Sequence, residues 1–450
     1  MHELTDRVRR IKDIRYVKGN VVYWMSREQR IEDNWSLIYA IETARSYGSK
    51  LCVAFCLPPE YLGSTIRQYS FMLDGLKEVS DGLRRLGVGF YLLEGYPEIE
   101  FPSFLSSVDA GLLITDFDPL DVNRRWKSRV AGEIDIAMHQ VDSHNIVPCW
   151  KVATRRISTY DTFRKRITPL LALYLVEYPS IEGMDDRWDE DEDRIDWDGA
   201  LARTVVDKSV PPVRWITPGE ASAKKMLSDF CKGRLFSYDA RKMNPVESGQ
   251  SDLSPYIHFG NISAQRIALE VKKVDAPDKE KEGYLEQLIV KKELADNFCL
   301  HTPEYDTTGA FPIWARRSLD EHRSDPREHV YSVKELEGAK THDPLWNAAQ
   351  TELLKIGKIH GSLRAYWAEK ILEWSRRPED ALAAALHLNN KYSLDGNDPA
   401  GYTGISMVVG GLYGRPWRTK DVIGKLEKHS YTQERFSYDV HAYYDRVAKL

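Results

Sequence analysis

Long apolar runs are missing from this sequence. None of its 450 residues lies in a run near the roughly 20 apolar residues that a membrane-spanning helix needs. Residues 1–6 also lack the apolar core of a secretory signal peptide. The five cysteines are an odd number and only Cys52 and Cys56 lie close together, which argues against a disulfide framework or a zinc site. We therefore expect a soluble, intracellular, cytoplasmic protein without a bound metal.

Several catalytic signatures are absent as well. No G-x-G-x-x-G follows a predicted strand, so the first part of the chain is not a typical NAD-binding module. The twelve histidines show no HExxH spacing, and no G-x-S-x-G elbow marks a hydrolase. A net charge of -5 argues against a protein that coats nucleic acid, although a local basic groove remains compatible with it.

Aromatic residues are plentiful, with 12 Trp, 24 Tyr and 13 Phe. Such a content suits stacking on a cofactor or on bases, and a large core explains it equally well. With 42% hydrophobic and 29% charged residues the chain is globular, and its length predicts two or three domains. We expect a monomer.

The first 150 residues alternate between short apolar runs and helical patterns. Residues 34–46 and 69–86 have helical periodicity. The runs between such segments are the kind that is buried on both faces of a sheet, and they are residues 21–25, 51–55, 90–93 and 112–115. This alternation predicts an α/β domain with a doubly wound, Rossmann-like parallel sheet over 1–150. Ligands of such sheets bind beyond the carboxyl ends of the strands.

The strand pattern fades after residue 150. Residues 151–216 read as an interdomain linker with a basic stretch near 155–166 and an acidic, solvated run at 185–193. From 217 to 450 helical periods dominate, which predicts an all-helical second domain. We find no internal repeats.

Two segments have features of a ligand site. Residues 251–256 place a serine at a predicted N-cap and Pro255 at the first helical position, so free N–H groups there would attract a phosphate, although an ordinary capped helix has the same pattern. Residues 395–402 form a dense Asp- and Gly-rich turn after the Asn389-Asn390 pair. Such a turn either receives the polar rim of a ligand or makes a corner between helices.

Three tryptophans form a possible row. Trp367 and Trp374 lie seven residues apart, which is two helical turns on one face. Trp346 would extend this row. Indoles spaced in this way suit single-electron transfer to a redox cofactor, whereas a stripe of core residues is the simpler explanation.

Together these segments resemble the photolyase/cryptochrome family, specifically its class II cyclobutane pyrimidine dimer photolyases. The resemblance covers nearly the whole chain. It is carried by VVYWMSREQR (21–30), DNW (33–35), TDF (115–117), VDSHNIVP (141–148), LSPYIHFG (253–260), KELADNF (292–298), DPLWN (343–347) and YWAEKILEW (366–374).

The resemblance implies that the helical domain is an FAD-binding domain and that the first domain is of the antenna type. The antenna pigment, if present, would be a deazaflavin or a folate. The FAD-binding residues that it implies are Tyr238, Ser251, Leu253, Ser254, Lys291, Asn389, Asp395 and Gly396. Trp346, Trp367 and Trp374 match the electron chain that photoreduces the flavin.

In that family, light-excited reduced flavin donates one electron to a pyrimidine dimer flipped out of DNA, the ring splits and the electron returns. The implied partner is therefore DNA containing pyrimidine dimers. Our candidates for the DNA-facing rim are Arg155, Arg156, Arg164, Lys391, Arg415, Arg418 and Lys420.

The sequence departs from the family pattern around the substrate site. The candidate catalytic positions are Gln287, Asn389, Met407 and Lys242, of which Gln287 stands for a Glu, Met407 for a Trp that packs on the dimer, and Lys242 for an Arg. Lys291 also replaces an Arg, Ala365 a Met, and Tyr413-Gly414 a His-Asp pair. These changes leave two hypotheses, dimer repair with a retuned site and a light- or redox-sensing flavoprotein without repair activity. We favour repair.

Overall fold

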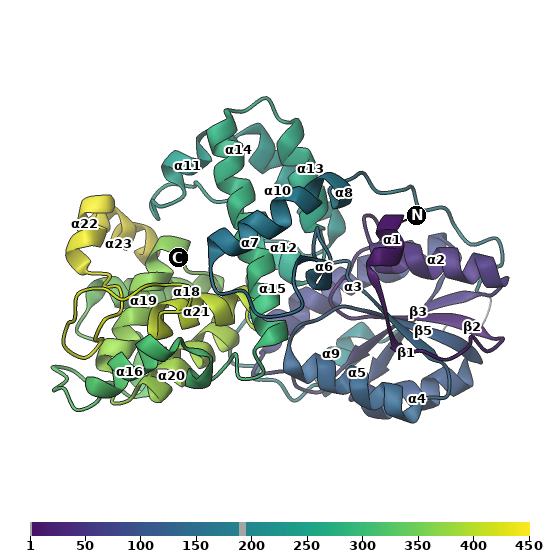
Figure 1. Ribbon diagram of the computed structural model, residues 1–450, viewed down its shortest axis with the longest axis horizontal. Coiled ribbons are helices and arrows are strands. Elements are labelled where there is room, and N and C mark those ends of the chain that lie inside the picture. The colour runs from purple at the N-terminus through teal and green to yellow at the C-terminus, as the bar shows by residue number, and fades with distance from the viewer. Residues whose placement is uncertain (1, 189–194) are drawn as a thin grey trace.

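The computed structural model describes residues 2–188 and 195–450, which form an α/β part and a helical part (Figure 1). In the described residues the α/β part contains one six-stranded sheet. Its strands are β1 (Val8–Lys12), β2 (Asn20–Met25), β3 (Leu51–Leu57), β4 (Gly89–Glu94), β5 (Ala110–Asp116) and β6 (Ala137–Val141). Its helices are α1 (His2–Asp6), α2 (Trp35–Tyr47), α3 (Ile66–Arg85), α4 (Pro97–Ser107) and α5 (Asp121–Glu133).

The strand order is β1-β6-β5-β2-β3-β4, and all neighbouring strands from β6 to β4 run parallel. This confirms the predicted doubly wound sheet and its four predicted strands. The edge strand β1 differs, because it pairs antiparallel with β6. Its central residues Arg9 and Arg10 are exposed, so β1 has no apolar run that sequence patterning would detect.

Side chains of β2 alternate between the two faces of the sheet, as the strand geometry requires. Val21 and Tyr23 pack with α2 and α3 on one face, whereas Val22 and Trp24 pack with α4 on the other. Every residue of β3 is buried. Because helices cover both faces, the carboxyl ends of the central strands are left as the place for a ligand.

The linker predicted over 151–216 is folded and is divided between the two parts. Phe163 and Ile167 belong to a core cluster of the helical part, whereas Met184 and Val206 belong to the core of the α/β part. The helices within this segment are α7 (Tyr160–Ile167), α8 (Leu171–Tyr174) and α9 (Trp197–Arg203). A further helix, α6 (Cys149–Val152), crosses the start of the segment. Residues 189–193 of the acidic run lie outside the described residues.

Residues 217–450 are mostly helical, as the sequence pattern predicted, and α15 packs against α21. The helices of this segment are α10 (Glu220–Lys232), α11 (Tyr238–Arg241), α12 (Ser254–His258), α13 (Ala264–Lys273), α14 (Asp278–Leu285), α15 (Lys292–His301), α16 (Ile313–Glu321), α17 (Val333–Glu337), α18 (Pro344–Ile356), α19 (Gly361–Trp374), α20 (Pro378–Tyr392), α21 (Pro399–Gly410), α22 (Tyr431–Ser437) and α23 (Val440–Ala448). A π-helical segment, η3 (Glu286–Lys291), joins α14 to α15. Across the described residues, we find no helix with the length and apolar character to span a bilayer.

Candidate functional site

Two cavities lie on opposite sides of the loop at 395–401. We name the first, about 250 Å³, the helical cavity; it lies among the C-terminal helices, where Ser251 and Arg364 contribute to its lining. We name the second, about 130 Å³, the sheet cavity; it lies beyond the strand ends, where Trp24 and Phe55 contribute. Within the loop, Asp398 faces the helical cavity and Asn397 the sheet cavity. The loop is therefore a wall shared by both.

The helical cavity brings together distant residues that the sequence analysis named. They are Tyr238, Ser251, Leu253, Ser254, Gln287 and Asp395. Two further lining cations, Lys358 and Arg364, were missed. They come from the start of α19 and the turn before it, about a hundred residues after Ser251, and no local pattern connects segments that far apart.

Other named residues lie beside this cavity rather than in its lining. Asn389 is buried behind it, with its side-chain nitrogen 2.9 Å from where a Cβ on the lining residue Gly401 would lie. Gly396 lines the sheet cavity instead. Lys242 pairs with Asp239, and Lys291 follows Gln287 by about one turn.

The start of α12 differs from the prediction of a serine N-cap. The helix begins at Ser254, and the preceding residue is Leu253, which makes no side-chain capping bond. The predicted hydroxyl cap is wrong by one position, because Pro255 occupies the second helical position rather than the first. Asp252 precedes this start in a left-handed conformation (φ 61°) and pairs with both Arg234 and Lys358, which holds Lys358 at the cavity.

The shared wall is fixed by a contact between Asp398 and His258 that joins the two cavities. Asp398 is the N-cap of α21, where Oδ1 accepts a hydrogen bond from the Ala400 amide at 2.8 Å. Its Oδ2 lies 3.0 Å from Nδ1 of His258, a residue that lines the sheet cavity. Burial alone would raise the pKa of Asp398, but the contact with His258, the charge of Arg27 and the Ala400 amide together hold that pKa well below its ordinary value.

Three tryptophans lead away from the helical cavity. Arg364 lines the cavity, and Trp367 follows it by one turn of α19. The ring centroids of Trp367 and Trp346 are 6.3 Å apart, and those of Trp346 and Trp374 are 5.6 Å apart. Trp346 therefore lies between the other two. Trp374 is 6% exposed, whereas Trp346 is fully buried.

Hydrogen bonds hold these indoles in place. The Trp367 Nε1 group donates to Oε1 of Gln350 at 2.9 Å, and the Trp346 Nε1 group donates to the carbonyl of Trp367 at 3.0 Å. Asp343 caps α18 by accepting from the Trp346 amide at 3.0 Å. The two helices are thereby joined at the point where their indoles meet.

The aromatic row continues beyond Trp374 to the surface. Tyr331 lies 5.2 Å from Trp374 between ring centroids, and His342 lies 5.4 Å from it. The Tyr331 hydroxyl is 2.7 Å from Nδ1 of His342. His342 in turn stacks on His329 at 3.7 Å. A phenol in contact with an imidazole can lose an electron and its proton together.

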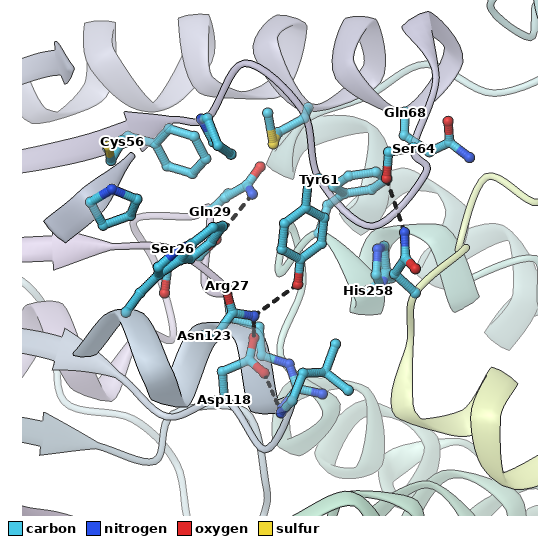
Figure 2. Close-up of a pocket in the computed structure, with 18 of the residues that line it drawn as sticks. Ser26, Arg27, Gln29, Cys56, Tyr61, Ser64, Gln68, Asp118, Asn123 and His258 are labelled. Carbon is cyan, nitrogen blue, oxygen red and sulfur yellow. Dashed lines mark hydrogen bonds between the residues drawn. The ribbon is translucent and has the colours of Figure 1, made fainter. Parts of the chain in front are cut away.

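The sheet cavity lies at the carboxyl ends of β2, β3 and β5 and is rich in aromatic rings (Figure 2). Its polar side is ordered by Asn123, which donates to the Tyr61 hydroxyl at 2.8 Å and to Asp118 at 2.7 Å. On the wall, Asn397 donates to the Ser64 hydroxyl at 3.0 Å. Its aromatic lining residues are Trp24, Phe55, Tyr61, Tyr69, Trp126 and Phe259. This lining suits a flat conjugated ring.

The basic residues named from the sequence fall into two groups. Arg155, Arg415, Arg418 and Lys420 are exposed. Arg156 is half-buried and donates to the Ala310 carbonyl at 2.9 Å. Arg164 is also exposed but pairs with Glu286, and Lys391 pairs with Glu337. The first four residues are the more available for a phosphate backbone.

A sheet domain joined to a helical domain with a cavity and a tryptophan row defines a photolyase- or cryptochrome-type fold. The Synechocystis cryptochrome structure has this fold, with a TM-score of 0.76 at 14% identity over 96% of this chain and 89% of that one. The DNA photolyase family model matches residues 21–182. A deoxyribodipyrimidine photo-lyase of Arabidopsis thaliana is 40% identical over 96% of this chain and 89% of the relative. That of Potorous tridactylus is 41% identical over 93% and 79%.

The chain belongs to the DNA photolyase family. The resemblance inferred from the sequence motifs is thereby confirmed, and the plant and animal relatives fit its class II assignment.

Proposed function

We propose that this protein uses light to split cyclobutane pyrimidine dimers in DNA, with FAD bound in the helical cavity. The row of indoles that begins one turn from the cavity lining and ends near the surface carries this proposal. Such a row gives a buried redox group a route to external electrons. The deoxyribodipyrimidine photo-lyase relatives support the choice of substrate.

The lining of the helical cavity fits FAD. Lys292, Lys358 and Arg364 supply positive charge for a pyrophosphate, and serine hydroxyls at 251 and 254 supply donors for phosphate or ribose oxygens. Tyr238 and Tyr284 add aromatic surface. Reduced FAD, when bound, supplies an electron on absorbing blue or near-ultraviolet light, and the electron returns after the ring has opened.

The sheet cavity is the proposed site of a light-collecting pigment, a deazaflavin or a folate. Its ring-lined interior and its place at the strand ends support this proposal. The loop at 395–401 lines both this cavity and the helical cavity, so excitation would travel a short distance. Chromatography of the pigments released on denaturation distinguishes the two classes and shows if neither is present.

DNA is the proposed partner, held at its phosphates by the exposed residues Arg155, Arg415, Arg418 and Lys420. Arg156, Arg164 and Lys391 already contact other protein groups and would contribute only after rearrangement.

The test is an illumination experiment on the chemically reduced, FAD-loaded protein. We expect thymine absorbance to recover in an oligonucleotide that contains dimers, in the light and not in the dark. If absorbance does not recover although the flavin is reduced, the repair proposal fails and a sensor without repair activity becomes the better hypothesis.

A further inference from the structure

Tyr160, Met407 and Tyr413 meet beside the helical cavity although they come from three separate segments. The Tyr160 hydroxyl donates to Sδ of Met407 at 2.8 Å. The rings of Tyr160 and Tyr413 lie 5.2 Å apart between centroids, tilted by 57°. All three side chains are partly buried. We name these three residues the rim cluster.

One wall of the cavity reaches the rim cluster along α21. Ala400 lines the cavity, and Gly404 and Met407 follow it at the spacing that places all three on one helix face. A Cβ added to Gly404 would meet no heavy atom within 4 Å. An open strip therefore leads from the cavity along α21 to Met407.

Another part of the lining reaches the same cluster along η3. Gln287 lines the cavity and Lys291 lies about one turn further on. The Lys291 ammonium lies over the Tyr160 ring, 5.9 Å from its centroid. Burial lowers the pKa of Lys291, and the nearby Lys242 ammonium lowers it further. The Lys291 ammonium thus covers a tyrosine ring at the mouth of the strip.

Two adjacent pyrimidines that leave the base stack lose their stacking partners. An aromatic face of the protein can replace that lost stacking. Tyr160 can offer such a face on the side of its ring where the flexible Lys291 lies, once that lysine moves, while Tyr413 supports the ring. Met407 itself is flexible and has no ring, so it supports a neighbouring ring better than it stacks.

We infer that Tyr160 stacks on the extrahelical pyrimidine dimer and that Met407 and Tyr413 position its ring. This inference rests on the proposed repair function. It assigns specificity for the lesion to a residue of α7, which lies on the segment between the two parts of the chain.

The test is equilibrium binding in the dark by FAD-loaded protein, measured by fluorescence anisotropy. The two probes are a single-stranded oligonucleotide with one thymine dimer and the same oligonucleotide without it. Tyr160→Ala should weaken binding of the dimer probe by about 10- to 100-fold and leave the undamaged probe unchanged, since stacking on one or two bases is lost. Tyr160→Phe keeps the stacking face and loses only the hydrogen bond to Met407, so it should lose much less discrimination than Tyr160→Ala.

The matched control is Tyr47→Ala. Tyr47 is an exposed tyrosine of the α/β part that also stacks on another ring, Tyr16, at 3.8 Å. Its loss should change neither probe. Equal FAD content and equal photoreduction in every variant show that the helical part remains folded.

Positioning by Met407 is tested with Met407→Leu, which keeps the volume and removes the sulfur acceptor. It should weaken dimer binding only when the Tyr160 hydroxyl is present, so its effect should vanish in the Tyr160→Phe background. An equal effect in both backgrounds would overturn the positioning role.

The outcomes separate this inference from the proposed function. If the wild type prefers the dimer probe and Tyr160→Ala keeps that preference, or loses affinity for both probes equally, Tyr160 does not stack on the lesion. If the wild type shows no preference for the dimer probe, the repair function fails and this inference with it.

Discussion

The indole of Trp346 lies parallel to that of Trp367, with 3° between the ring planes and 6.3 Å between the centroids. The Trp346 Nε1 group also donates to the Trp367 carbonyl at 3.0 Å. Of the other two indoles in the row, Trp374 contacts that of Trp346. An electron moving inward from Trp374 therefore passes through Trp346 before it reaches Trp367.

This order predicts that Trp346→Phe interrupts the row as severely as Trp367→Phe. Each change should slow photoreduction of oxidised flavin by an order of magnitude or more, because a phenyl ring is much harder to oxidise than an indole. The measurement is the rate of flavin bleaching under blue light with an external thiol.

Trp197→Phe is the control, since Trp197 stacks on Phe90 in the α/β part and is not in the row. If the flavin of the Trp346→Phe variant is photoreduced at the wild-type rate, Trp346 is not part of the electron path.

Tyr331 should be the last donor of the row. Tyr331→Phe keeps the ring beside Trp374 and removes the hydroxyl that contacts His342. Without loss of a proton to the histidine, the charge returns faster, so less flavin stays reduced after each flash. Transient absorption should show a tyrosyl radical in the wild type and none in this variant. A shared decay time for both proteins would contradict this role.

The loop between the cavities should tolerate little extra volume at Gly396. A Cβ there would lie 2.6 Å from the carbonyl oxygen of Asn390, so the backbone has to move. We expect Gly396→Ala to lower the free energy of unfolding by about 1–3 kcal/mol and to reduce the FAD retained on purification.

Gly404→Ala is the matched substitution in open space, and it should stabilise α21 by about 0.5–1 kcal/mol. Denaturant unfolding and flavin content measure both variants. Equal stability for the two would show that the loop at Gly396 yields easily.

Glu369 makes stability depend on pH. Burial raises the pKa of this residue of α19 to about 8. The His429 amide, which donates to its carboxylate, lowers the pKa, and the nearby charge of Glu373 raises it. In the unfolded chain it ionises near its ordinary pKa, so the folded form holds a proton that the unfolded form loses. Its contribution is full below about pH 4.5 and is lost as the pH rises to about 8.

Glu369→Gln keeps the shape without the ionisation. The unfolding free energy of the wild type should therefore fall more steeply between about pH 5 and pH 8 than that of the variant, by roughly 2–4 kcal/mol. Denaturant titrations at the two pH values measure the difference. Parallel pH dependence in the two proteins would show that Glu369 is ionised in the folded state.

Sequence patterns predicted the two parts of the fold because burial has a period. The fully buried strand β3 and the helical spacing of Trp367 and Trp374 are local signals of this kind. Strand β1 was missed, since its exposed arginines conceal the pattern. Periodicity shows which face of a helix or strand is buried. It does not show which other element packs against that face.

The site was accordingly less accessible from the sequence. The place of Trp346 between the other two indoles depends on how α18 packs on α19. The contact of Tyr160 with Met407 spans 247 positions of the chain. Gly396 was expected at the FAD and lines the sheet cavity instead, because neighbouring residues of the loop at 395–401 face opposite cavities.

The most direct test of light-driven repair is a single-turnover count of dimers. Reduced, FAD-loaded protein is mixed with less than one equivalent of dimer-containing oligonucleotide without oxygen, given one saturating flash and analysed by chromatography. We expect each dimer to convert to two adjacent, unlinked thymines while the flavin stays fully reduced, and a dark sample to stay unchanged. An unchanged number of dimers after repeated flashes, with the flavin still reduced and the DNA bound, would contradict it.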